Sequence, residues 1–147
     1  MAVKAVIDTN IWISALINPF GFPARIREHF EKGTFTAVIS MPIIEEIADV
    51  LSRPRIRNKY GITDNDIEEL LILIDERAEN VKVSADIDIC LDKDDNLVIE
   101  SAIKGKAQYL IARDDDMKFD IKVLSFLKQH DVSVVSIDKF LRVISKT

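Results

Sequence analysis

Acidic side chains at four widely separated places in the chain have the spacing expected of a divalent-metal site. They are Asp8, Glu46, Asp95 and the run Asp114–Asp116. Carboxylates gathered without a balancing Arg or Lys repel one another, and a divalent cation would supply the missing positive charge. Oxygen ligands favour Mg²⁺ or Mn²⁺, whereas a chain with one cysteine and two histidines offers little for zinc.

Two of these acidic groups follow predicted strands directly. The apolar run at 3–7 is typical of a buried strand and ends at Asp8, and the strand predicted at 109–112 is followed by Asp114 and Asp116. In open parallel sheets, ligands bind beyond the carboxyl ends of the strands. Both groups are therefore expected at the same edge of the sheet.

Helical periodicity places the other two acids toward the body of the protein. On the helix predicted at 42–52, Glu46 borders the apolar stripe, whereas Glu45 and Asp49 point away from it. Asp95 heads the buried face of a later helix, where the helix N-terminus also favours an acid. Each acid alone could be an ordinary helix cap or a solvated charge, so the hypothesis depends on the joint pattern.

The elements that must position these residues alternate along the chain. Strands are predicted at 3–7, 35–39, 81–83, 109–112 and 133–136. Helices are predicted at 11–17, 23–32, 42–52, 55–60, 63–79, 95–104, 121–130 and 138–145. The residues predicted to cap helices are Thr9 or Asn10, Thr63 with Asp66, and Asp94 or Asp95. Strands separated by helices imply right-handed crossovers, so we predict one α/β domain over 1–147, with a mostly parallel sheet of about five strands flanked by helices on both faces.

Composition narrows the setting in which the chain works. A net charge of −5 means that nucleic acid would have to be held by a local basic patch or by metal, rather than by overall charge. The one cysteine cannot form an internal disulfide, which indicates a reducing compartment. The first residues show no cleavable signal pattern, and no apolar stretch approaches the ~20 residues that cross a bilayer. We therefore expect a cytoplasmic protein with no membrane partner.

Four segments resemble the motifs of the PIN-domain family of metal-dependent nucleases, especially its small prokaryotic VapC-like toxins. In chain order they are V-I-D-T-N at 6–10, S-M-P-I-I-E-E-I-A-D-V-L at 40–51, D-K-D-D-N-L-V-I-E-S-A at 92–102 and Y-L-I-A-R-D-D-D at 109–116. The resemblance spans nearly the whole chain. Each motif is short, but four in order at suitable spacing make a fairly specific match.

The resemblance implies a parallel sheet flanked by helices and an acidic pocket for one or two Mg²⁺ or Mn²⁺ ions. It also implies endonucleolytic hydrolysis of RNA phosphodiester bonds and, for the toxin members, inhibition by a small antitoxin and formation of homodimers. The chain departs from the family at Ala112, where many members have Thr or Ser. Thr9 is a candidate to supply the missing hydroxyl.

Residue roles follow from this match. The residues expected to act in catalysis are Asp8, Glu46, Asp95, Asp114 and Asp116. Of these, the expected metal ligands are Asp8, Asp95 and Asp114, with Glu46 and Asp116 at a second metal position or in the outer shell. The residues expected to contact substrate are Thr9, Asn10, Arg113, Arg55 and Arg57. The last two belong to a basic run at 53–59, for which simple solvation is the alternative.

Two other kinds of function remain open from the sequence. One is a non-catalytic RNA- or protein-binding module that keeps the fold. The other is a receiver-type phosphoacceptor domain, which also gathers acids around Mg²⁺ at the edge of a parallel sheet. The receiver is disfavoured because Asp8 stands alone and no Lys is found at a strand end.

Overall fold

The computed structural model describes residues 3–90, 92–112 and 121–145 of the 147-residue chain. Three of the predicted site residues, Arg113, Asp114 and Asp116, lie outside these ranges.

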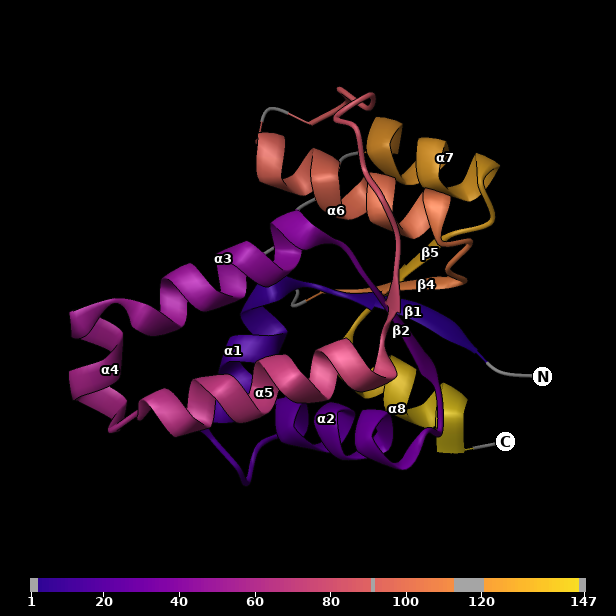
Figure 1. The fold of residues 1–147 in the computed structure, drawn as a ribbon. Helices are drawn as coiled ribbons and strands as arrows, with labels where there is room; N and C mark the ends of the chain where they lie inside the picture. Colours follow the sequence, from indigo (N-terminus) through magenta and orange to yellow (C-terminus); the bar gives the residue numbers. More distant parts are fainter. Residues whose placement is uncertain (1–2, 91, 113–120, 146–147) are drawn as a thin grey trace.

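The centre of the molecule is a five-stranded sheet in which every described pairing is parallel (Figure 1). The strands are β1 (Lys4–Ile7), β2 (Thr36–Ile39), β3 (Glu79–Asn80), β4 (Tyr109–Ile111) and β5 (Ser133–Val135). Their order across the sheet is β3-β2-β1-β4-β5. The predicted α/β class and the strand number are confirmed.

Helices cover both faces of this sheet. Those in the described part of the chain are α1 (Thr9–Ile17), α2 (Phe22–Lys32), α3 (Met41–Ser52), α4 (Pro54–Tyr60), α5 (Asp64–Arg77), α6 (Lys93–Lys104), α7 (Ile121–Gln129) and α8 (Ile137–Ser145). Helices α6 and α7 lie on one face, and α2, α5 and α8 lie on the other (Figure 1). Helices α3 and α5 extend together beyond the sheet and α4 joins them at the far end, so these three helices form an arm. Nowhere in the described ranges is a helix both long and apolar enough to cross a membrane.

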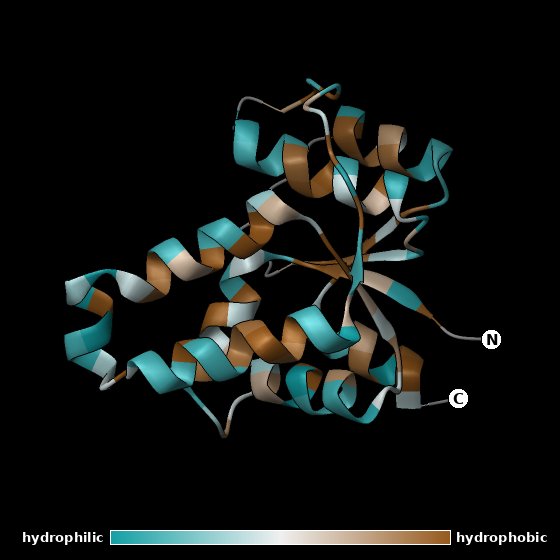
Figure 2. Cartoon of the chain, viewed as in Figure 1, coloured by the Kyte–Doolittle hydropathy of each residue, from teal (hydrophilic) through white to brown (hydrophobic). Residues whose placement is uncertain are grey.

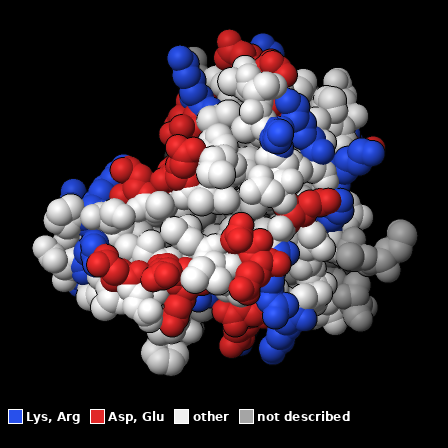
Figure 3. Space-filling view, in the orientation of Figure 1, with Lys and Arg blue, Asp and Glu red and all other residues white. Residues whose placement is uncertain are grey.

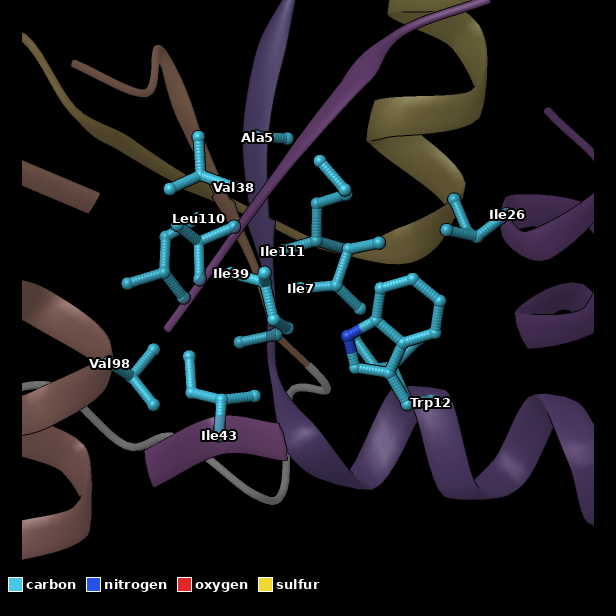
Figure 4. Packing of buried hydrophobic residues seen from close by; sticks show 14 of the residues in the cluster. Ala5, Ile7, Trp12, Ile26, Val38, Ile39, Ile43, Val98, Leu110 and Ile111 are labelled. Atoms are coloured by element: carbon cyan, nitrogen blue, oxygen red, sulfur yellow. The ribbon is translucent and has the colours of Figure 1, made fainter. Parts of the chain in front are cut away.

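The core is built on the central strands β1, β2 and β4, which are largely apolar (Figure 2). The side chains of β1 from Ala5 to Ile7 are at most 1% exposed, as expected for a parallel strand covered by helices on both faces. Trp12 packs edge-on against Phe30, with ring centroids 5.2 Å apart, and its ring lies beside Ile7 (Figure 4). This packing joins α1 and α2 to the sheet and so fixes the helix that follows Asp8.

The predicted position of the third strand and the predicted cap of α6 are wrong. The third strand is Glu79–Asn80 rather than 81–83, because pairing with β2 ends where the N–H of Val81 donates to Ile39 O. Helix α6 begins at Lys93 with Asp92 as its N-cap, since the Asp92 side chain accepts a hydrogen bond from the Asp94 N–H at 2.9 Å.

The predicted cap of α5 is confirmed. Thr63 and Asp66 form a reciprocal capping box, in which each side chain accepts a hydrogen bond from the other residue's backbone N–H.

Candidate functional site

The strand order creates a topological switch between β1 and β4. From β1 the chain continues to β2 on one side of the sheet, and later enters β4 on the other side. The Asp8 N–H donates to Ile111 O at 3.0 Å, so Asp8 lies where both strands end. Its side chain is buried, with 7% of the residue exposed. Asp8 therefore lies where ligands bind in sheets of this kind.

Asp8 is not an ordinary helix cap. Helix α1 begins at Thr9, two residues earlier than predicted, so Thr9 and Asn10 occupy the first turn rather than the cap, and that part of the prediction is wrong. Asp8 holds the N-cap position, but its side chain makes no capping hydrogen bond to the N–H groups of that turn. A structural need for a cap therefore does not explain an acid at this position.

Thr9 connects the start of α1 to the acid on α3. Its hydroxyl lies 3.3 Å from Glu46 Oε2 and donates a hydrogen bond to it, and Thr9 is 2% exposed. Glu46 is half-buried, whereas Glu45 and Asp49 are exposed. The inward orientation predicted for Glu46 is confirmed, and Thr9 places a hydroxyl among these acids.

Carboxylates from α3 and from the start of α6 repel one another across this region. Burial raises the pKa of Glu46, and the nearby carboxylates of Asp94, Asp92 and Asp95 raise it further, against the hydrogen bond from Thr9. Burial also raises the pKa of Asp95, followed in size by repulsion from Asp92 and Asp94. Figure 3 shows acidic side chains over α3 and over the start of α6, on the side of the molecule where the arm leaves the body.

Among the acids at the start of α6, Asp95 is the one directed inward. Asp95 is half-buried, whereas Asp92 and Asp94 are exposed, and the Asp92 carboxylate is engaged as the helix cap. Burial therefore favours Asp95 as the residue that faces the site.

The acids that the structure describes approach one another without forming a complete ligand cage. Over residues 3–90, 92–112 and 121–145, no group of three or more His, Cys, Asp or Glu side chains is close enough to hold a metal ion. Thr9 links Glu46 to the start of α1, next to Asp8, and Asp95 acts on the pKa of Glu46, whereas Asp114 and Asp116 follow β4 in the sequence outside the described ranges. Their roles as ligands stay predictions.

Sequence reasoning missed a polar stripe on α6 that holds the segment before the site. Asn96 Oδ1 accepts hydrogen bonds from the N–H groups of Ile89 and Cys90, and its Nδ2 donates to Cys90 O. One turn later, Glu100 accepts from the N–H groups of Ser84 and Asp86. These bonds tie the backbone of the segment 84–90 to α6, and they fix the chain that leads into α6.

Glu100 is fully buried and negatively charged. Burial acts to raise its pKa, but the hydrogen bonds from Lys104 and from the Ser84 N–H outweigh it, so the pKa is lowered overall. Lys104 Nζ lies 2.7 Å from Glu100 Oε2. The sequence signal for this stripe is the spacing of Asn96, Glu100 and Lys104, each four residues after the last on one helix.

The basic run of the arm lies apart from the acids, at the opposite end of α3. Arg57 pairs with Asp64 at 2.7 Å and also donates to Ile62 O, so much of its hydrogen-bonding capacity is used within the fold. Arg55 is exposed, and we find no ion pair for it with any residue that the structure describes. Asn10, exposed at the start of α1, lies nearer to the acids.

Comparisons with known proteins agree with this architecture. A family model described as PIN domain matches residues 4–116. An uncharacterized protein of Methanocaldococcus jannaschii, MJ1680, is 34% identical over 115 residues, which cover 78% of this chain and 73% of that protein.

Among solved structures, the fold is similar to that in the crystal structure of VapBC2 from Rickettsia felis bound to a DNA fragment from their promoter. The TM-score is 0.54 and the sequence identity 16%, over 91% of this chain and 98% of that one. Similarity at this level of identity concerns the fold alone. The family model covers most of the chain in one continuous match that includes Asp8, Glu46 and Asp95, and on this basis the chain belongs to the PIN-domain family.

Proposed function

We propose that this protein is a Mg²⁺- or Mn²⁺-dependent endoribonuclease, the toxin of a toxin–antitoxin pair that acts in the cytoplasm. The observation that carries the proposal is the repulsion between Glu46 and the acids at the start of α6, at the carboxyl end of a PIN-domain sheet. Such repulsion destabilises the folded protein, so we infer that a bound cation compensates for it.

The chemistry of the donor atoms fits a hard divalent ion. Every charged neighbour that acts on the pKa of Glu46 or Asp95 within the described residues is another carboxylate. Carboxylate oxygens are the ligands that Mg²⁺ and Mn²⁺ prefer. The proposed ligands are Asp8, Asp95 and Asp114, with Glu46 and Asp116 at a second ion or in the outer shell.

A cation held there would polarise the scissile phosphate and lower the pKa of a bound water. The protein's own residues orient the reactants. The Thr9 hydroxyl holds Glu46 in place through its hydrogen bond. We propose that it takes the role of the hydroxyl that Ala112 lacks. Asn10, exposed beside Thr9, is proposed to hydrogen-bond water or phosphate, and Arg113 to contact the phosphate.

Partners of the chain follow from the family rather than from the site. A small antitoxin protein and a homodimer are proposed on the resemblance to VapC-like toxins and on the fold shared with the VapBC2 structure. Arg55 is proposed to contact the RNA backbone, and Arg57 to do so less strongly because Asp64 already neutralises it.

The experiment is cleavage of a labelled single-stranded RNA by purified protein, with Mn²⁺, with Mg²⁺ and with EDTA. We expect metal-dependent cleavage by the wild type and a loss of at least about 100-fold in Asp8→Asn and Asp95→Asn, since each removes a charge that holds the cation. Glu45→Gln is the matched control, because Glu45 neighbours Glu46 but points into solvent. Full activity in folded Asp8→Asn protein would refute the proposal.

A second function, a non-catalytic RNA-binding module with this fold, is favoured by one observation. The described acids do not form a ligand cage by themselves. Calorimetry with Mn²⁺ separates the two, because the nuclease requires binding that Asp8→Asn weakens and the binding module requires none.

A further inference from the structure

A groove of about 410 Å³ lies between the end of α1, the start of α2 and the end of α4. Its walls are largely apolar and include Ile17 and Ile137. Two aromatic rings also line it and remain accessible, with Phe22 55% and Tyr60 43% exposed. Asn18 adds an amide, and none of the lining residues is acidic.

A basic side chain lies close to each of these two rings. The Arg25 guanidinium lies 5.5 Å from the centroid of Phe22, and Lys59 Nζ lies 5.3 Å from the centroid of Tyr60. As far as the structure describes the chain, neither Arg25 nor Lys59 forms an ion pair, in contrast to Arg57. A protein of net charge −5 therefore has a local surface where aromatic rings lie beside basic groups that form no described ion pair.

These two features match the chemistry of single-stranded nucleic acid. Unpaired bases stack on exposed aromatic rings, and the phosphates between them are held by nearby cations. The charges also disfavour a second copy of this chain as the occupant. A two-fold contact through the groove would bring Lys59 and Arg25 toward their own counterparts, and like charges repel.

The groove also lies along a path to the acids. Helix α1 carries Thr9 and Asn10 at its start and Ile17 at its end, and seven residues of helix span about 10 Å. A few nucleotides of extended strand cover such a length. A strand whose phosphate reaches Asp8 would thus pass along α1 into the groove.

We propose that this groove is a base-binding subsite for single-stranded RNA, in which Phe22 and Tyr60 stack on unpaired bases while Arg25 and Lys59 contact phosphates. The identity of the RNA as substrate rests on the proposed function. Stacking itself requires only that the strand be unpaired.

The test is binding of a fluorescein-labelled 12-nucleotide single-stranded RNA, measured by anisotropy in EDTA so that cleavage does not interfere. We expect Phe22→Ala and Tyr60→Ala each to weaken binding about tenfold, since stacking on one ring contributes roughly that much. Tyr60→Phe keeps the ring and should bind as the wild type does. Duplex RNA of the same sequence should show no such dependence.

Phe20→Ala is the matched control. Phe20 lies two residues before Phe22, in the turn that precedes α2, and is 95% exposed, but it does not line the groove. Lys59→Gln should lower the slope of log affinity against log salt by about one phosphate contact. Melting curves of each variant exclude unfolding as the cause.

Retention of wild-type affinity by both alanine variants, or equal weakening by Phe20→Ala, would overturn the subsite. The subsite would also be overturned if Phe22→Ala or Tyr60→Ala changed the molar mass of the protein in light scattering while RNA binding stayed intact. That result would assign the groove to contacts between protein chains. Failure of the proposed function looks different: a wild type that binds RNA through Phe22 and Tyr60 but never cleaves it keeps the subsite and loses the nuclease.

Discussion

Neutralising Glu46 should stabilise the protein when no metal is bound. Burial raises the pKa of the Glu46 carboxyl most, and the nearby carboxylates of Asp94, Asp92 and Asp95 raise it further. In Glu46→Gln the repulsion disappears, while an amide oxygen can still accept the hydrogen bond from Thr9. The substitution therefore removes an unfavourable interaction and leaves the favourable one in place.

The size of the effect follows from the exposure of the groups. Asp92 and Asp94 are exposed, so solvent screens each interaction to about 0.2–1 kcal/mol. The three interactions together make Glu46→Gln more stable by about 0.6–3 kcal/mol at pH 7. For a chain of 147 residues, each kcal/mol corresponds to about 2–4 °C in Tm.

The pH dependence has a definite sign. The folded-state pKa of Glu46 is raised, so its ionised form costs stability above that pKa, and the cost disappears once the pH falls below the ordinary range of a glutamate. The wild type should therefore approach Glu46→Gln in stability as the medium becomes acidic. The assay is thermal unfolding followed by circular dichroism in EDTA, at pH 7 and in steps down to about pH 4, with Glu45→Gln as the solvent-exposed control expected within about 0.5 kcal/mol of the wild type.

Manganese should reverse the order of the two proteins. Saturation at 100 times Kd stabilises the folded state by about 2.7 kcal/mol. Glu46→Gln, which lacks one carboxylate, should gain less. The electrostatic reasoning would be refuted if, in EDTA at pH 7, the Tm of Glu46→Gln were equal to or below that of the wild type. A difference in Tm between the two proteins that does not change with pH would refute it as well.

Two further predictions concern the supports of the site. Glu100→Gln removes the buried charge that pairs with Lys104 and accepts from Ser84, so we expect a loss of about 1–3 kcal/mol at pH 7 in urea unfolding; because the pKa of Glu100 is lowered, this loss should shrink as the pH falls through that pKa. Gly105→Ala would place a Cβ in steric overlap with Val38 Cγ1 and should cost about 1–3 kcal/mol. In a double-mutant cycle, Val38→Ala should relieve most of this cost because it removes the overlapping methyl group. Equal costs of Gly105→Ala with Val or Ala at position 38 would exclude the steric explanation.

Much of the fold followed from local patterns in the sequence. The apolar runs of β1 and β4 indicate buried parallel strands, and the Thr63–Asp66 capping box marks the start of α5. The inward side of α3, and with it the choice of Glu46 over Glu45, followed from helical periodicity. These features can be predicted from the sequence because each depends on residues only a few positions apart.

The third strand and the start of α6 could not be placed in this way. The position of β3 is set by its hydrogen bonds to β2, so the two residues that pair are Glu79 and Asn80 rather than the more apolar residues that follow them. Asp92, Asp94 and Asp95 are all able to cap a helix. The path of residues 84–90, held by the buried stripe on α6, selects Asp92.

The sequence by itself determined that the chain forms a parallel α/β domain with Asp8 at the end of a strand, because side-chain periodicity and the alternation of strands and helices along the chain are local properties. The tertiary structure alone decided that Glu46 meets the acids of α6, that Thr9 donates to Glu46, and that Phe22 and Tyr60 line one groove. Each of these pairings joins residues from different helices. Their proximity depends on how the helices pack around the sheet, and no periodicity within a single segment encodes it.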